Sequence, residues 1–328
     1  MTGHRVYVGA DRVLDELFDE IARGLADRGH DVVRDIDLAA EDGALHVLVV
    51  TSRTPVTVEF MDRHPELRGV VFVSSGVNSI DVAEASRRGV LVANGATPEN
   101  HGSMAEATIM LALALSFRLS DRMTAVAELR PRPRPAELDS RPLRGATIGL
   151  LGFGRISREV CKRLAAWDVG RILCHTRTPR EWPGVEFCSF DTVVEESDIL
   201  SVHLPLTPAT RGLIGAAELA RMRPGAMLIN TSRGGIIDED ALAEALARGD
   251  IGGAAIDTFD IEPLPAASPL RQAPNIMLTD HVIGHTVDMY RSLVPAAIEN
   301  VDCVVRGETP PYLVNPEARH HATAGKQR

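Results

Sequence analysis

Lysine is almost missing from this chain of 328 residues, which contains only Lys162 and Lys326. Its 45 acidic residues outnumber its 35 basic ones, so the formal net charge is −10 and positive charge depends on arginine. Proteins that bind nucleic acid or an anionic membrane surface nonspecifically need a surplus of positive charge. The composition therefore predicts no nucleic-acid partner and no membrane partner.

Cysteine is also scarce, and its four copies are scattered. No two of them form a C-x-x-C pair or have the spacing of a zinc site, so we expect no metal and four reduced thiols. The longest apolar run, residues 105–115, contains Glu106 and is far shorter than the ~20 residues that cross a bilayer. The first ten residues lack the apolar segment of a secretory signal. These absences predict a cytoplasmic protein.

What the sequence does contain is a regular alternation of short apolar runs with helical patterns. In the first hundred residues we expect strands at residues 5–8, 31–34, 45–50, 69–73 and 90–92, and helices at residues 13–27, 55–61 and 80–88. Strands that alternate with helices pair in parallel through right-handed crossovers. This part of the chain predicts an α/β domain.

A second run of the same kind predicts a doubly wound, parallel nucleotide-binding sheet. After a strand near residue 148, its strands are expected at residues 172–174, 199–204, 226–230, 251–256 and 276–279, and its helices at residues 158–167, 216–221 and 239–248. A mostly apolar helix at residues 103–118 precedes it, followed by a loop in which Pro131, Pro133 and Pro135 forbid helix. A last helix is expected at residues 289–306, and disorder from Pro316 onward.

The second run opens on a glycine turn at the end of its first strand. Gly152 allows a tight turn there, and Gly154 lets the backbone approach a pyrophosphate at the start of the next helix. The third position of the G-x-G-x-x-G pattern holds Ser157, where close helix–strand packing usually requires glycine. The turn predicts a dinucleotide site, with one departure.

Three polar stretches follow later strands, and open α/β sheets bind ligands at such strand ends. They contain Arg233, Glu262 and His281. An arginine binds a carboxylate with a bidentate fork, a histidine exchanges a proton near neutral pH, and a carboxylate orients the histidine. Beside a dinucleotide, this set favours hydride transfer between a nicotinamide and a 2-oxo or 2-hydroxy acid.

From residue 143 to residue 286 the chain closely resembles the D-isomer-specific 2-hydroxyacid dehydrogenases, including glyoxylate/hydroxypyruvate reductases and phosphoglycerate dehydrogenases. The matching segments are residues 143–149, 203–207, 222–226, 230–238, 257–263 and 280–286. Residues 76–81 resemble the family's glycine loop, and residues 103–106 resemble the start of its interdomain helix. The resemblance implies a flavodoxin-like substrate domain (residues 1–99 and 290–328), a Rossmann domain (residues 100–289), an active site in the cleft between them, and a homodimer.

The resemblance also assigns roles to individual residues. Arg233 is expected to bind the substrate carboxylate and carbonyl, His281 to be the acid/base, and Glu262 to be its partner. His285 is expected to be secondary to His281. Asp257 is expected to hold the nicotinamide carboxamide.

The remaining expected site residues fall into two groups. Other coenzyme contacts are expected at Gly152, Phe153, Gly154, Arg155, Ile156, His175, Thr176, Arg177, His203, Leu204, Pro205, Thr231, Ser232 and His281. Other substrate contacts are expected at Arg53, Asn100 and the backbone of Ser75, Gly76 and Val77. Arg53 is equally consistent with a solvated side chain, Asn100 with a helix cap, and His203 with a packed histidine.

Two departures from the family pattern bear on coenzyme and mechanism. An NAD site usually has an acidic residue about 20 residues after the glycines, but this chain has His175 there, followed by Arg177 and Arg180. NADP is therefore expected to be preferred over NAD, since arginines bind its 2′-phosphate. Asp280 replaces the proline that commonly precedes the family's histidine, and it either faces solvent or acts on His281.

One alternative belongs to a different class of protein. Some relatives of this fold are nucleotide-sensing corepressors, and a fold alone does not determine function. The complete set of Arg233, Glu262 and His281 favours the enzyme.

Overall fold

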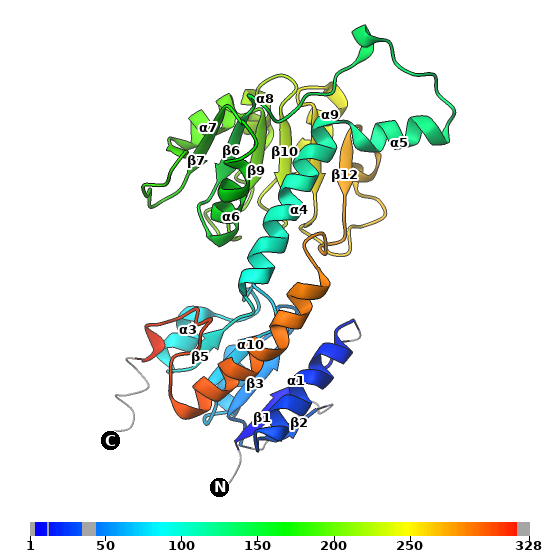
Figure 1. The fold of residues 1–328 in the computed structure, drawn as a ribbon. Coiled ribbons are helices and arrows are strands. Elements are labelled where there is room, and N and C mark those ends of the chain that lie inside the picture. The colour runs from blue at the N-terminus through cyan, green and yellow to red at the C-terminus, as the bar shows by residue number, and fades with distance from the viewer. Residues whose placement is uncertain (1–3, 12, 35–43, 320–328) are drawn as a thin grey trace. The chain divides into compact units, whose positions relative to one another are not determined.

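A computed structural model describes residues 4–11, 13–34 and 44–319 of the chain (Figure 1). They form two compact units: unit 1 comprises Met1–Asn100 and Thr286–Arg328, and unit 2 comprises His101–His285. Each unit is built on one parallel sheet, which confirms the α/β fold class.

Unit 1 contains five strands in the order β2-β1-β3-β4-β5, which is the flavodoxin-like order. The strands are β1 (Arg5–Val8), β2 (Asp31–Val33), β3 (Val47–Val50), β4 (Gly69–Phe72) and β5 (Leu91–Ala93). Side chains alternate across this sheet. Val47 and Val49 pack with α1 (Asp15–Asp27) and α10 (Val287–Arg306), whereas Leu48 and Val50 pack with α2 (Val58–Arg63) and α3 (Val82–Arg87).

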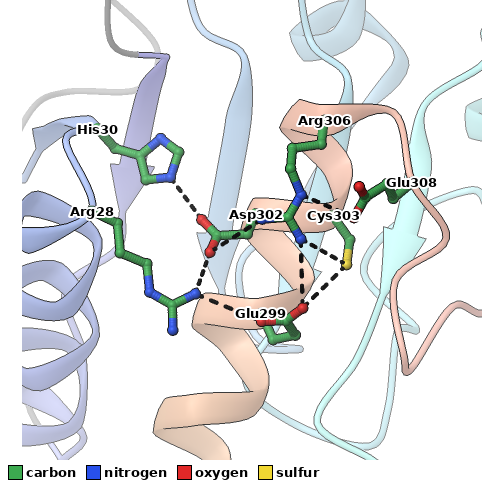
Figure 2. Close-up of polar contacts among 7 residues, drawn as sticks. All are labelled: Arg28, His30, Glu299, Asp302, Cys303, Arg306 and Glu308. Carbon is green, nitrogen blue, oxygen red and sulfur yellow. Dashed lines mark hydrogen bonds and ion pairs between the residues drawn. The ribbon is translucent and has the colours of Figure 1, made fainter.

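A polar network joins α10 to the segment that leads from α1 into β2 (Figure 2). Asp302 of α10 accepts hydrogen bonds from Arg28 and from His30 Nε2, the latter at 2.9 Å. Burial alone would raise the pKa of Asp302, but these two bonds lower it. The aspartate is therefore ionised, and it fixes the contact between the two helices that lie side by side in Figure 1.

The segment after α10 is ordered up to Arg319, so the expectation of disorder from Pro316 is wrong for residues 316–319. Asn315, fully buried, accepts a hydrogen bond from Val92 N at 2.7 Å and donates to Val90 O at 2.9 Å. Ala318 is also fully buried, and Glu317 accepts a bond from Ser86 at 2.8 Å. The segment satisfies backbone groups of the edge strand β5. The rest of the expected disorder, residues 320–328, lies outside the described residues.

Unit 2 contains seven parallel strands in the order β12-β11-β10-β9-β6-β7-β8. Counted from β6, the order is 3-2-1-4-5-6 with one further strand, which is the Rossmann arrangement. The strands are β6 (Thr147–Leu151), β7 (Arg171–His175), β8 (Glu186–Phe187), β9 (Ile199–Val202), β10 (Met227–Asn230), β11 (Gly253–Ile256) and β12 (Ile276–Leu278).

Helices cover both faces of this sheet. One face packs with α4 (Pro98–Ser116) and α6 (Arg155–Leu164), and the other with α7 (Phe190–Glu196), α8 (Ala216–Arg221) and α9 (Glu239–Arg248). A further helix, α5 (Leu119–Ala127), has no buried residue. No single helix among the described residues is long and apolar enough to cross a membrane, although α4 and α5 satisfy the length and composition test as a pair bent by 57°.

The expected elements are all present, with boundaries that differ by a few residues. Helix α4 begins at Pro98, five residues earlier than expected, and Thr97 caps it by accepting the Asn100 N–H at 3.3 Å. Among the described residues, two α-helices and one strand were not expected: α5, α7 and β8. The loop with alternating prolines is extended as expected, but it ends in a short 3-10 turn, Pro135–Glu137.

Candidate active site

The glycine turn after β6 is shaped by close contact with neighbouring backbone. Gly152 adopts a positive φ of 99°, and its N–H donates to the His175 carbonyl at 2.8 Å. A Cβ atom at this position would lie 2.4 Å from the His203 carbonyl oxygen. Glycine is therefore required at position 152 by the protein's own packing.

Gly154 has a different environment. It is the N-cap residue of α6, no side chain caps the helix, and an added Cβ would have no described atom within 4 Å. The packing of the described residues does not require glycine here, and the helix presents uncapped N–H groups beside Arg155 and Ile156. A helix N-terminus of this kind fits a pyrophosphate.

Ser157 explains the departure from the glycine pattern. Its side chain is fully buried, and its hydroxyl donates to the Gly152 carbonyl at 2.8 Å. The serine therefore ties α6 to the turn through a hydrogen bond that glycine could not make.

An aromatic cluster packs against the same turn. The Phe153 ring meets the rings of Trp182 and Phe187 edge-on, with centroids 5.4 and 4.9 Å away. The Arg158 guanidinium lies 5.7 Å from the Phe153 centroid and 5.9 Å from that of Trp182. The sequence analysis did not anticipate this cluster, which holds residues 182–187 against the glycine turn.

His175 is the last residue of β7, and Arg177 follows two residues later. His175 Nδ1 lies 3.2 Å from the Cys188 carbonyl oxygen, and its ring meets Phe190 edge-on at 5.9 Å. Thr176 is partly buried and Arg177 is exposed. No acidic side chain stands at the end of this strand.

Glu262 and His281 form a direct pair within unit 2. His281 Nδ1 lies 2.9 Å from each carboxylate oxygen of Glu262. Glu262 also accepts the Phe259 N–H at 3.1 Å, which fixes the carboxylate. Because a carboxylate can only accept, Nδ1 carries the proton and Nε2 is the nitrogen that can exchange one.

The backbone at His281 is unusual, since its φ is +63°, in the left-handed region. The loop is held by Asp257, which is only 2% exposed and accepts bonds from Thr279 Oγ1 at 2.6 Å and Ile283 N at 3.3 Å. Burial raises the pKa of Asp257, and these bonds oppose that shift. Asp257 thus supports the histidine loop, a structural role beside the coenzyme contact expected of it.

Asn230, the last residue of β10, organises the loop that carries Arg233. Its amide donates to the Arg233 carbonyl at 2.9 Å, and its oxygen accepts Ser232 N at 3.0 Å and Ser232 Oγ at 2.7 Å. Burial lowers the pKa of Arg233, while the charge of Glu262 acts in the opposite direction. Arg233 is therefore half-buried within the electrostatic reach of the Glu262–His281 pair.

Gly234 brings these two loops together. A Cβ atom at this position would lie 1.8 Å from the Phe259 carbonyl oxygen, so only glycine allows the observed approach. Thr231, in the same loop, is buried with its hydroxyl 3.4 Å from that of Thr108.

The loop after β9 contains His203, Leu204 and Pro205. His203 Nε2 lies 3.0 Å from Ser201 Oγ, and burial lowers the pKa of His203 to about 4. The ring is therefore neutral at pH 7, as expected for a packed histidine.

The expected substrate residues lie in unit 1, at the carboxyl ends of β3 and β4 and at the start of α4. Ser75 Oγ donates to Asn100 Oδ1 at 2.6 Å, and Asn94 donates to the Ser75 carbonyl at 2.8 Å. Asn100 lies inside α4, so the interpretation of Asn100 as the helix cap is wrong. Gly76 is buried, Val77 is partly buried, and Arg53 is exposed.

The described residues contain no group of three or more histidine, cysteine or acidic side chains that could hold a metal. Asn230, Thr279 and Ser157 shape the site but were not expected to do so. Each acts through side-chain hydrogen bonds within loops whose course the sequence does not show.

Comparisons with known proteins agree on one family. Residues 108–282 match the D-isomer specific 2-hydroxyacid dehydrogenase, NAD binding domain. The glyoxylate reductase of Thermofilum pendens is 38% identical over 271 residues, which cover 80% of this chain and 79% of that protein. The D-3-phosphoglycerate dehydrogenase of Mycobacterium leprae is 35% identical over 275 residues, which cover 82% of this chain and 51% of that protein.

A solved structure extends the similarity to the fold. The NADPH-dependent glyoxylate/hydroxypyruvate reductase of Sinorhizobium meliloti, in complex with NADP and malonate, is 28% identical. Its TM-score is 0.82, with 97% of this chain and 98% of that chain covered.

Proposed function

Since this chain belongs to the D-isomer-specific 2-hydroxyacid dehydrogenase family, we propose that it reduces the C2 carbonyl of a small 2-oxo acid to a D-2-hydroxy acid. The family is one of NAD(P)-dependent enzymes, which favours an enzyme over a corepressor. The single observation that carries the proposal is the Glu262–His281 pair at 2.9 Å, within the electrostatic reach of Arg233.

The glycine turn fits a dinucleotide. The open position at Gly154 and the uncapped start of α6 suit a pyrophosphate, with Phe153, Arg155 and Ile156 beside it. When bound, a reduced nicotinamide supplies the hydride. We propose that the loops of His203–Pro205 and Thr231–Ser232, together with Asp257, would hold the nicotinamide.

We propose a preference for NADP over NAD. His175 ends β7 and Arg177 follows it, and neither repels a 2′-phosphate as an acidic residue would. The relative from Sinorhizobium meliloti is NADPH-dependent by its own description, which supports this choice.

Three side chains would bind the substrate and transfer the proton: Arg233, His281 and Glu262. Arg233 binds the substrate carboxylate with its guanidinium fork and polarises the carbonyl. His281 gives a proton from Nε2 to the carbonyl oxygen, while Glu262 holds Nδ1 and stabilises the charged ring. We propose that unit 1 is the substrate domain, through the backbone of Ser75–Val77 and the side chains of Asn100 and Arg53.

The test is turnover with a panel of 2-oxo acids, including glyoxylate, hydroxypyruvate and pyruvate, with NADPH and NADH compared on each. We expect oxidation of the coenzyme with at least one acid and a higher kcat/KM for NADPH. Arg233→Lys should raise KM for the acid about tenfold or more, because lysine keeps the charge but loses the fork. Absence of turnover with every acid would contradict the proposal.

We also propose a homodimer formed through unit 2. An apolar groove beside α4 is lined by Ile109, Met110 and Leu113 of α4, by Phe117 and Leu119 where α4 leads into α5, and by Trp167 after α6. Met110, Phe117 and Leu119 are about half exposed, and α5 adds Met123 and Val126 at 65% and 77%. Exposed apolar surface of this kind marks a protein interface, and a second copy presents the same groove.

A further inference from the structure

His175 is locked to the turn that the coenzyme would use. It is the last residue of β7, it pairs with Leu151 of β6, and its carbonyl accepts the Gly152 N–H at 2.8 Å. In the dinucleotide-binding fold, the residue at this strand end meets the 2′ position of the adenosine ribose. The side chain at position 175 is therefore the one that meets either a 2′-hydroxyl or a 2′-phosphate.

The ring orientation assigns its protons. Nδ1 lies 3.2 Å from the Cys188 carbonyl oxygen, and a carbonyl can only accept, so Nδ1 carries a proton. Phe190 packs edge-on at 5.9 Å and holds the ring in this orientation. Among the described residues, Nε2 has no hydrogen-bond partner. In the neutral ring Nε2 is therefore an acceptor, and in the charged ring it is a donor.

We propose that His175 makes the coenzyme preference depend on pH. The neutral ring accepts a hydrogen bond from the ribose 2′-hydroxyl of NADH, as an acidic residue does in an NAD site. The charged ring donates to the 2′-phosphate of NADPH and attracts its negative charge. The inference rests on the proposed function, because it needs the glycine turn to bind a dinucleotide.

The acidic side chains and thiols of the neighbouring elements are paired or neutral, and Arg155 and Arg158 of α6 and Arg180 of the loop after β7 carry a charge that does not change with pH, so none of them reproduces a pH-dependent effect of the ring. Strand β6 carries no ionisable side chain. The thiols of Cys174 and Cys188 are neutral, because burial raises the pKa of both, that of Cys174 to about 12. The acidic residues of β8 and α7 all pair with arginine: Glu186 and Glu196 with Arg171, and Asp191 and Glu195 with Arg221.

Arg177 contributes a preference for NADPH that does not change with pH. It lies two residues after His175, it is exposed, and its guanidinium stays charged at every pH of interest. Histidine changes its charge between about pH 5 and 8. The two side chains therefore predict different effects: a constant bias from Arg177 and a pH-dependent one from His175.

The experiment measures Kd for NADPH and NADH by titration calorimetry between about pH 6.5 and 8.5. Above pH ~6 the 2′-phosphate keeps most of its second charge and does not dominate the slope. We expect the ratio of Kd for NADH to Kd for NADPH to rise about tenfold from pH 8.5 to 6.5, the difference of one charge-assisted hydrogen bond. Repeating the titration in buffers of different ionisation heat should show proton uptake with NADPH but not with NADH.

Two variants separate the contributions. His175→Gln should remove both the slope and the proton uptake, whereas Arg177→Gln should lower the ratio at every pH and keep the slope. A ratio that does not change with pH in the wild type, or a slope that persists in His175→Gln, would overturn the inference while leaving the proposed function intact. Failure to bind either nucleotide at any pH would reject the proposed function and this inference with it.

Discussion

The left-handed backbone of His281 limits which replacement tests its role. Its φ is +63°, a conformation that asparagine adopts more readily than most residues, so His281→Asn should keep the loop. We expect kcat to fall by about 10²–10⁴-fold, because asparagine cannot donate the proton. The Kd of NADPH should change little. The measurement is steady-state turnover beside calorimetric binding.

Glu262→Gln provides a matched control for the same pair. A neutral amide retains an oxygen for the Phe259 N–H, but it cannot stabilise a charged ring. We expect kcat to fall in this variant also, with nucleotide binding retained. Wild-type turnover in His281→Asn would show that another group supplies the proton.

The lowered pKa of His203 predicts that the free energy of unfolding falls in acid. Its pKa is lowered to about 4 in the folded protein from the ordinary value of 6.5, because burial penalises the charged ring. The unfolded chain therefore binds more protons between these two values. The neutral His203 ring therefore contributes to the free energy of unfolding. This contribution is complete above pH 6.5 and is lost as the pH falls toward 4, and its upper limit is roughly 3 kcal/mol.

Urea unfolding at pH 7.5, 6.0 and 5.0 measures this effect. His203→Gln is the comparison, since glutamine can still bond to Ser201 but does not titrate in this range. The fall in unfolding free energy between pH 7.5 and 5.0 should be smaller in the variant. Equal falls in the two proteins would assign the acid sensitivity to other groups, such as His4, whose pKa is also lowered by burial.

At the scale of loops and elements, Gly234 is the contact on which the site geometry depends. A methyl group there would meet the Phe259 carbonyl oxygen at 1.8 Å, so Gly234→Ala must push the Arg233 loop away from the Glu262 loop. We expect kcat/KM to fall about 10²-fold, the effect of a displacement near 1 Å. Gly215→Ala is the control, because its added methyl group meets its nearest atom at 3.6 Å. Equal activity of both variants would contradict the proposed contact.

Most elements could be predicted because their patterns are strong. Buried parallel strands such as Val47–Val50 and Thr147–Leu151 are continuous apolar runs, and α9 carries its own cap at Asp238. Strand β8 has two residues and pairs only with β7. Helix α7 contains the β-branched run Thr192–Val194, so its propensity is low, and its cap at Ser189 was overlooked.

The predicted start of helix α4 is wrong. Its start was expected five residues too late, although Thr97 and Pro98 form a recognisable cap and first residue. The apolar pattern determined the expected start, and the cap signal lies outside that pattern. Asn100 was consequently considered as a cap when it lies in the first turn of the helix.

The sequence motifs predict the main residues of the candidate site but not the hydrogen bonds that position them. Arg233, Glu262 and His281 follow strand ends, which the sequence indicates. Asn230 donates to the Arg233 carbonyl, the Phe259 N–H donates to Glu262, and Thr279 donates to Asp257, which supports the His281 loop. Such bonds depend on how a loop returns across the sheet, and that path is set by contacts between residues far apart in the chain, such as Gly234 with Phe259.

At the scale of the whole molecule, the two units share a plan but differ in strand order. Unit 1 has the flavodoxin-like order and unit 2 the Rossmann order, and in both units the candidate ligand loops follow the carboxyl ends of parallel strands. The chain enters unit 2 within the first turn of α4 and leaves it at Thr286, the N-cap of α10. Both crossings therefore coincide with the starts of long helices, which makes α4 and α10 the elements that connect the two folds.

The apolar groove on unit 2 predicts the state of the assembled protein. Light scattering after gel filtration should give a mass twice the 35.4 kDa of one chain. Phe117→Glu should give the single-chain mass, because Phe117 is 51% exposed and a buried, unpaired charge opposes an apolar interface. Val13→Glu is the control: Val13 is 77% exposed but belongs to unit 1, so the dimer mass should persist. A single-chain mass for the wild type at ~10 μM, or a dimer of Phe117→Glu, would contradict the proposed interface, since standard interfaces are stable well below that concentration.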